Sequence, residues 1–244
     1  MDLKNQVKLF LKSFFLPSFW NDQGMQNIGF LFCLDGWLTE RLKLDGAKLK
    51  EARSRHLEFF NTHPVMSGMV LGVTCAFEEN RKAPQAIKRA LSSSLAAIGD
   101  RAFGSILRPL GAAVSLSLCA LASGWPLPCL AWLLGTSYLC LYNWPALRIR
   151  WSGIAMGYGL QEKIVMTLSE KGWQRKMELA RRFGFAVSIL LVMGFAWMTR
   201  RGDFAKPLFF VAALFVLKRY YWSAARIHAA AIMVAILLGL GGYF

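Results

Sequence analysis

Acidic residues are scarce in this 244-residue chain. Only 14 Asp and Glu stand against 29 Lys and Arg, which leaves a formal net charge of +15, and charged residues make up 18% of the total. Hydrophobic residues reach 55%, whereas about a quarter of the residues in a soluble domain are charged. Disordered chains are poor in hydrophobic residues, so disorder is excluded. The composition leaves a membrane protein with a basic surface or an apolar nucleic-acid-binding protein.

Patterned cysteine and histidine are absent as well. The five cysteines form no C-x-x-C pair and have no histidine at metal-ligand spacing, so we interpret them as small buried apolar residues. The sequence contains no glycine-rich phosphate loop, and none of its three histidines has a recognisable phosphoryl-transfer setting. We therefore predict no catalytic residue, no metal and no cofactor.

Long runs without charge are the strongest positive signal. Residues 109–147 contain no Asp, Glu, Lys or Arg. The length of this run is twice the roughly 20 residues that cross a bilayer core. A glycine and two prolines at 124–128 interrupt this run, and such a cluster ends a helix. We predict a hairpin of two transmembrane helices over 109–147, in preference to the alternative of a large soluble core. Further uncharged runs predict C-terminal transmembrane helices over 183–244.

The basic residues indicate orientation. Eight Lys and Arg lie in 148–182, and basic loops stay on the cytoplasmic side, so we expect this segment to be cytoplasmic and the C-terminus external. Near the N-terminus, Lys4, Lys8 and Lys12 share one helical stripe while apolar residues fill the other face. This pattern predicts a helix in the cytoplasmic membrane interface. The positive charge is therefore interpreted as a membrane-surface signature, with no nucleic acid as partner.

Residues 61–108 hold candidate binding groups. The apolar run 65–77 has 13 residues, which is too short for an upright span and typical of a re-entrant or broken helix. Asn61 precedes this run, and Glu78 and Glu79 follow it. Amides and carboxylates suit the vicinal hydroxyl groups of a sugar, and broken helices often carry transport sites. This stretch is the predicted substrate region.

Two alternatives about charged side chains stay open. Glu78 and Glu79 would also fit a solvated helix end beside the basic residues that follow them. Asp100 and Arg108 lie two turns apart in a second broken element, where an ion pair at membrane depth would be functional. An interfacial position for both fits the sequence equally well.

Several short motifs follow one another along residues 15–200. They are Asn21 with Met25-Gln26, His56 through Pro64, Val70 through Thr74, Glu78-Glu79, Ala96 through Asp100 with Phe103 and Arg108-Pro109, and Asn143 through Arg148 to Gly153, Gly157, Tyr158 and Gly159. Together they resemble the IID component of the mannose-family phosphoenolpyruvate-dependent sugar phosphotransferase system (PTS). The chain departs from that pattern at Asp22-Gln23-Gly24, at Ser93-Ser94 and at Ala97.

The resemblance implies a transport subunit that is not an enzyme by itself. A IID protein pairs with a IIC protein in the bacterial inner membrane as a trimer of heterodimers, and partner IIA and IIB proteins phosphorylate the sugar through their histidines. The residues implied to contact the sugar or shape its site are Gln26, Asn61, Glu78 and Glu79. The residues implied to be structural or gating are His63, Gly99, Asp100 and Arg108, with Gly99 and Asp100 setting a bend between helix pieces.

Two further function classes remain possible at this point. The chain would also fit a diverged IID-like subunit with an assembly or regulatory role and no sugar flux, or an unrelated membrane scaffold. The predicted fold is an all-α polytopic membrane protein with broken or re-entrant helices and an N-terminal amphipathic cytoplasmic arm. Its predicted segments are the arm (1–60), the substrate region (61–108), the hairpin (109–147), a basic cytoplasmic segment (148–182) and the C-terminal helices (183–244).

Overall fold

The computed structural model describes residues 1–121, 126–169, 175, 178–179, 181–184 and 186. Their regular structure is entirely helical, which confirms the predicted all-α class. In chain order the elements are α1 (Leu3–Ser13), the 3₁₀ turn η1 (Leu16–Phe19), α2 (Asn27–Gly36), the π-helix η2 (Trp37–Arg41), α3 (Gly46–His56), α4 (Ser67–Glu79), α5 (Gln85–Gly99), the π-helix η3 (Asp100–Leu107), α6 (Arg108–Leu121), α7 (Leu127–Leu160), the 3₁₀ turn η4 (Gln161–Lys163) and α8 (Ile164–Ser169).

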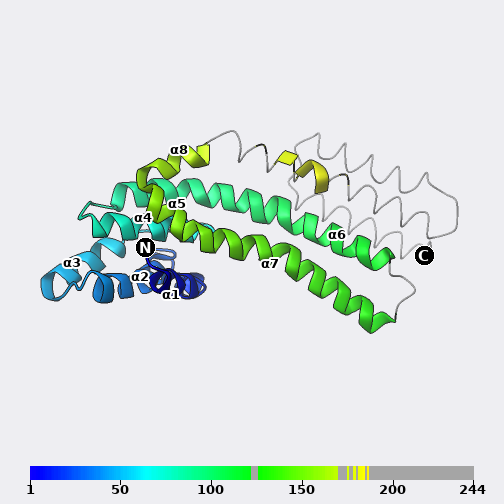
Figure 1. Ribbon diagram of the computed structural model, residues 1–244, viewed down its shortest axis with the longest axis horizontal. Helices are drawn as coiled ribbons and strands as arrows, with labels where there is room; N and C mark the ends of the chain where they lie inside the picture. The colour runs from blue at the N-terminus through cyan, green and yellow to red at the C-terminus, as the bar shows by residue number, and fades with distance from the viewer. Residues whose placement is uncertain (122–125, 170–174, 176–177, 180, 185, 187–244) are drawn as a thin grey trace.

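The helices α6 and α7 form the predicted hairpin. They lie side by side and extend away from the end of the molecule where α1 to α4 gather (Figure 1). The helix α6 ends at Leu121 and α7 begins at Leu127. Pro128 lies in the first turn of α7, where proline is tolerated because the first turn needs no N–H donor. The predicted C-terminal helices fall almost entirely outside the described residues.

Within the described parts of the chain, no helix is both long and apolar enough to cross a membrane. The structure pairs α6 with α7, and the crossing of a membrane by these two helices stays a prediction. The helix α7 runs past the predicted end of the hairpin, through Arg148 and Arg150, to Leu160.

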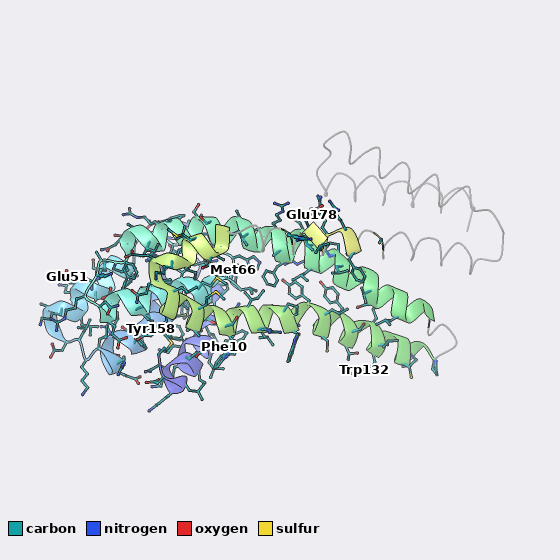
Figure 2. All side chains as sticks on the ribbon, turned by 45° about the horizontal axis from the view of Figure 1, so that its top comes forward. Phe10, Glu51, Met66, Trp132, Tyr158 and Glu178 are labelled. Carbon is teal, nitrogen blue, oxygen red and sulfur yellow. The ribbon has the colours of Figure 1, made fainter. Side chains whose placement is uncertain are left out.

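The N-terminal arm is docked on α7. Arg150 of α7 is buried, and its Nη1 donates a hydrogen bond to the Ser13 carbonyl at 2.7 Å, at the C-terminal end of α1. Gln6 Nε2 donates to the Trp151 carbonyl at 3.2 Å, and Phe10 packs edge-on against the Trp151 ring at 5.3 Å. Figure 2 shows Phe10 where α1 approaches α7. The arm therefore shares the core of the remaining chain.

The helix α4 is the centre of the fold. Every residue from Ser67 to Glu78 is buried, and its main neighbour is α7. Gly72 of α4 faces the backbone of Ile154, and Gly157 of α7 faces the backbone of Met69. A Cβ on either glycine would lie 2.1 or 2.2 Å from the facing carbonyl oxygen. Small residues on facing helices let the two backbones approach this closely. These glycines therefore set the distance between α4 and α7.

Candidate functional site

A turn at residues 21–26 and the segment after α3 hold two predicted site residues together. The Gln26 N–H donates to the Phe60 carbonyl at 2.8 Å, and the Phe60 N–H donates to the Gly24 carbonyl at 3.2 Å. The buried Gln26 side chain accepts, through Oε1, a hydrogen bond from the Thr62 N–H at 3.2 Å. Asn61 lies between two residues whose backbone Gln26 fixes. The structure thus brings Gln26 and Asn61 together.

Asn61 presents its amide outward. The residue is exposed, and within the described chain its side chain makes no hydrogen bond. In the same segment, Thr62 Oγ1 and Glu58 Oε2 are buried and have no partner among the described residues. A primary amide offers both donors and an acceptor, and a hydroxyl offers one of each. The segment therefore carries polar groups that the fold itself does not use.

Glu78 lies in a buried cluster with two residues of α3. Arg55 donates from Nε to Oε1 at 2.9 Å and from Nη2 to Oε2 at 2.8 Å, and His56 Nε2 is 2.9 Å from Oε1. The carboxylate is only an acceptor, so Nε2 carries the proton. The Glu78 side chain is 4% exposed, and both of its oxygens are engaged. Its role in the structure is to fasten the end of α3 to the end of α4.

Glu79 joins two other elements. Its carboxylate accepts a hydrogen bond from Arg41 Nη2 of η2 at 2.9 Å and another from the Tyr158 hydroxyl of α7. Figure 2 places Tyr158 at the end of the molecule where α3 and α4 lie. Both glutamates thus pair with side chains from other elements, and the open alternative of a solvated helix end does not describe them. The contribution of Glu79 is to hold η2 against α7.

His63 connects the two predicted broken elements. Its ring stacks on Phe103 of η3 at 5.1 Å with an interplanar angle of 12°. A Cβ on Gly99 would lie 2.2 Å from the His63 Cβ, so only glycine permits this contact. The chain changes from α-helix to π-helix directly after Gly99, and π-helical segments within helices frequently occur at functional sites. Gly99 and Asp100 lie at this change of helix type, where the family resemblance implies a bend.

Of the two alternatives left open for Asp100 and Arg108, the structure does not form the ion pair. Both side chains are exposed, and within the described chain neither forms a salt bridge. Two helical turns separate them by about 11 Å along the axis, which is too far for direct contact. Across the same described residues, no three His, Cys, Asp or Glu side chains gather in a way that would hold a metal ion.

Lys88 of α5 is a buried residue that the sequence pattern did not single out, and it lies against the end of α3 and the segment that follows α3. Its ammonium group donates to the His56 carbonyl at 3.1 Å and lies 4.6 Å from the ring centroid of Phe30 and 5.5 Å from that of Phe60. Lys88 shares the buried face of α5 with Leu91 and Leu95. That spacing, i, i+3 and i+7, was the available signal that this lysine faces inward. Arg55 and His56 offered no comparable signal, because their partner Glu78 is more than 20 residues away.

We expect the stability of the chain to depend on His56 near neutral pH. Burial lowers the pKa of His56 below its ordinary value of 6.5, although the hydrogen bond to Glu78 raises it. Above pH 6.5 the ring is neutral in both folded and unfolded chains. As the pH falls through 6.5, the unfolded chain takes up a proton that the folded chain resists, so stability is lost. Thermal unfolding in detergent micelles between pH 7.5 and about 5.5 measures this loss.

The matched variant for that experiment is His56→Gln. Glutamine keeps an N–H that donates to Glu78 but does not titrate. The dependence on pH over this interval should become shallower in the variant. An unchanged slope would assign the dependence to other groups.

Residues 1–204 match the family model of the PTS mannose/fructose/sorbose family IID component. The mannose-specific EIID component of Escherichia coli K12 is 33% identical over 193 residues, which cover 75% of this chain and 65% of that protein. The fructose permease IID component of Bacillus subtilis is 32% identical over 197 residues, covering 78% of this chain and 68% of that protein. The chain thus spans slightly less than two thirds of its E. coli relative.

Two solved structures share the fold over nearly the whole chain. One is a membrane protein with a TM-score of 0.74 and 26% identity, covering 99% of this chain and 96% of the other. The second is from the complex of the mannose transporter ManYZ with microcin E492, with a TM-score of 0.57, 26% identity and coverage of 100% and 96%. The family model, the relatives and the fold agree, and the chain belongs to the mannose/fructose/sorbose family of PTS IID components.

Proposed function

We propose that this chain is the IID subunit of a mannose-family PTS permease. It forms the sugar-translocating unit with a IIC subunit and delivers the sugar for phosphorylation by IIB, which IIA supplies with phosphate. Phosphoryl transfer occurs on the partner proteins, and this chain contributes binding and movement. The observation that carries the proposal is the family match over residues 1–204. The likeness to the ManYZ mannose transporter supports the IIC partnership.

The membrane location and assembly belong to the same proposal. The protein is a multi-pass component of the bacterial inner membrane, with its N-terminus in the cytoplasm and its C-terminus outside, and it assembles as a trimer of IIC–IID heterodimers. The fold shared with a membrane protein and with a mannose transporter supports the membrane location. Basic residues in 148–182 support the orientation.

We propose distinct roles for the four substrate-site residues. Asn61, exposed and without a side-chain partner in the described chain, contacts the sugar. Gln26 orders the backbone on either side of Asn61. Glu78 and Glu79 shape the site from behind, because their carboxylates already hold α3, η2 and α7 in place. Because the backbone around Asn61 is already ordered, a sugar hydroxyl that binds there needs little rearrangement of the main chain, which favours binding.

The gating roles follow the contacts of the second broken element. His63 couples the segment before α4 to η3 through its contacts with Phe103 and Gly99. Asp100 begins the π-helix and Arg108 follows it, so both lie where α5 and α6 would change their relative direction. Their exposed charges are available to the IIC subunit on closure of the site.

Phosphoenolpyruvate-dependent uptake tests the proposed function. Inner-membrane vesicles that contain this chain and a IIC subunit, supplied with IIA, IIB and the general phosphotransferase proteins, should accumulate phosphorylated sugar. Vesicles that lack this chain should not. Intact assembly with IIC but no flux for mannose, fructose, sorbose or an amino sugar would contradict the transport function and favour an assembly role.

Asn61→Ala should reduce sugar uptake without loosening the fold. The variant removes an exposed amide with no partner in the described chain. Because surface substitutions usually have small effects, the free energy of unfolding should change by no more than about 0.5 kcal/mol. Loss of hydrogen bonds to the sugar should raise the KM for uptake about tenfold, which corresponds to about 1.4 kcal/mol. Asn80→Ala is the control, since Asn80 is also exposed, at the end of α4, and its amide makes one long hydrogen bond, to Gln161 Oε1 at 3.5 Å. Equal uptake in both variants would remove Asn61 from the site.

A further inference from the structure

Lys88 of α5 is a buried ammonium group without an ion pair. The residue is 1% exposed. Among the described residues its Nζ makes one hydrogen bond, to the His56 carbonyl at 3.1 Å, and no salt bridge. The charge of Glu58 acts on it without direct contact. Lysine is almost never fully buried unless it is paired, so the burial of Lys88 needs a reason other than charge pairing.

This burial reduces the stability of the fold. Removal from water lowers the pKa of Lys88 from 10.5 to about 8, even though the charge of Glu58 raises it. Below pH 8 the lysine is charged in both the folded and the unfolded chain, and the destabilisation is present in full. It is relieved as the pH rises from about 8 toward 10.5. An apolar side chain of similar length would avoid it. Side chains that lower stability are typical of functional sites.

The contacts of Lys88 lie on the segment that leads to Asn61. Its ammonium group bonds to the carbonyl of His56, at the end of α3, and lies 5.5 Å from the centroid of the Phe60 ring. The Phe30 ring lies 4.6 Å from the same ammonium group and 4.3 Å from the Phe60 ring. An aromatic ring attracts a cation, and more strongly where water is excluded. Lys88 therefore holds both ends of the segment from His56 to Phe60.

Phe60 determines the direction of the Asn61 side chain. Phe60 forms an isolated β-bridge with Met25, and neighbouring side chains of an extended backbone point to opposite sides. The burial agrees with this alternation, because Phe60 and Thr62 are buried and Asn61 between them is exposed. A Phe60 ring that is held against Lys88 thus turns the Asn61 amide outward.

We propose that Lys88 positions Asn61 for the sugar by holding Phe60, an inference that rests on the transport function proposed above. The ammonium group attracts the Phe60 ring and fixes the carbonyl at the end of α3, so the backbone between them keeps one course. Gln26 fixes the backbone on the other side of Asn61. Asn61 is thereby ordered before the sugar arrives, and such preorganisation strengthens binding. Lys88 itself is buried and acts only through this segment.

Lys88→Met tests the proposal, because methionine keeps the unbranched apolar stem and removes the charge. Uptake is measured in proteoliposomes that contain the complex with IIC, supplied with IIA, IIB and the general phosphotransferase proteins, for mannose, fructose and sorbose in turn. We expect the KM to rise about fivefold with an unchanged kcat, less than for Asn61→Ala because the amide is kept. The unfolding midpoint should stay or rise, because a buried unpaired charge is lost. Lys48→Met, on the exposed side of α3, should change neither quantity.

A lower unfolding midpoint with an unchanged KM would make Lys88 a structural residue and overturn the proposal. Failure of the wild-type complex to take up any of the three sugars would contradict the transport function, and the role of Lys88 with it. Wild-type uptake with an unchanged KM in Lys88→Met would contradict only the role of Lys88.

A double variant shows whether Lys88 acts through Asn61. In the Asn61→Ala background, the addition of Lys88→Met should change the KM by less than about twofold, because the amide that Lys88 positions is already gone. Independent effects would instead multiply to about fiftyfold. That result would overturn the positioning role.

The charge of Lys88 can also be removed without a substitution, by raising the pH from 7 to about 9. The titratable and charged groups around it are His56 of α3, Glu58 in the next segment and Arg89 of α5. Imidazole is neutral over this interval, and carboxylates and guanidinium groups keep their charge. The ratio of the KM of Lys88→Met to that of Lys48→Met should fall from about five toward one. A ratio that does not depend on pH would assign the effect to the shape of methionine and overturn the proposal.

Discussion

Replacing Glu78 by Gln is expected to lower the free energy of unfolding by about 3–5 kcal/mol, because it leaves the other members of a buried ion pair without their partner. Arg55 makes two hydrogen bonds to the Glu78 carboxylate, and His56 makes a third. A neutral amide presents only one acceptor oxygen to these donors, and its NH₂ group faces a guanidinium that cannot accept a hydrogen bond. The midpoint of unfolding in mixed detergent micelles measures the loss.

The control for this prediction is Glu51→Gln. Glu51 also pairs with Arg55, at 3.4 Å, and the substitution removes the same charge. Its side chain is 78% exposed, and Figure 2 shows it at the outer edge of α3. An exposed pair four residues apart on a helix contributes about 0.5 kcal/mol or less. Equal effects at positions 51 and 78 would show that burial does not decide the strength of this pair.

Loss of sugar uptake in Glu78→Gln would therefore have a structural cause. The carboxylate is covered by Arg55 and His56, so fewer folded molecules, rather than a missing contact to the sugar, would lower the rate. Asn61→Ala should show the opposite combination, with a raised KM and an unchanged unfolding midpoint. The two variants together separate the residue that contacts the sugar from the residue that holds the site.

Local sequence signals predicted the helices well. The uncharged run with its glycine and prolines located the hairpin, and α6 and α7 end and begin beside that cluster. The apolar run at 65–77 corresponds to α4, which begins at Ser67 and ends at Glu79. Both signals act within one or two helical turns, through proline geometry and apolar spacing. A single sequence records such effects directly.

Contacts between distant residues were the part that the sequence could not supply. Glu78 is next to basic residues in the chain, yet its partners are on α3, because the segment after α3 folds back toward α4. Asp100 and Arg108 suggested a pair that the helix keeps apart. The pairing of Gln26 with the backbone around Asn61 depends on a turn 35 residues earlier, and only the family resemblance pointed to both residues.

The close approach of α4 and α7 leads to the last prediction. Gly157 is buried, and a Cβ there would lie 2.2 Å from the Met69 carbonyl oxygen and 3.0 Å from the Val73 nitrogen. These are backbone atoms within a buried helix, so no side chain can rotate to make room. The helices must separate instead, and the contacts of α4 with α7 weaken together. We expect Gly157→Ala to lower the free energy of unfolding by about 3 kcal/mol, at the upper end for overpacking.

Gly159→Ala provides a control on the same helix. Gly159 is exposed, and a Cβ there would meet nothing within 4 Å, so the higher helix propensity of alanine should stabilise the chain by up to about 1 kcal/mol. The same substitution two residues apart should thus shift the unfolding midpoint in opposite directions. Gly72→Ala, which brings a Cβ 2.1 Å from the Ile154 carbonyl oxygen, should match Gly157→Ala. Stabilisation by all three substitutions would mean that α4 and α7 do not touch through their glycines.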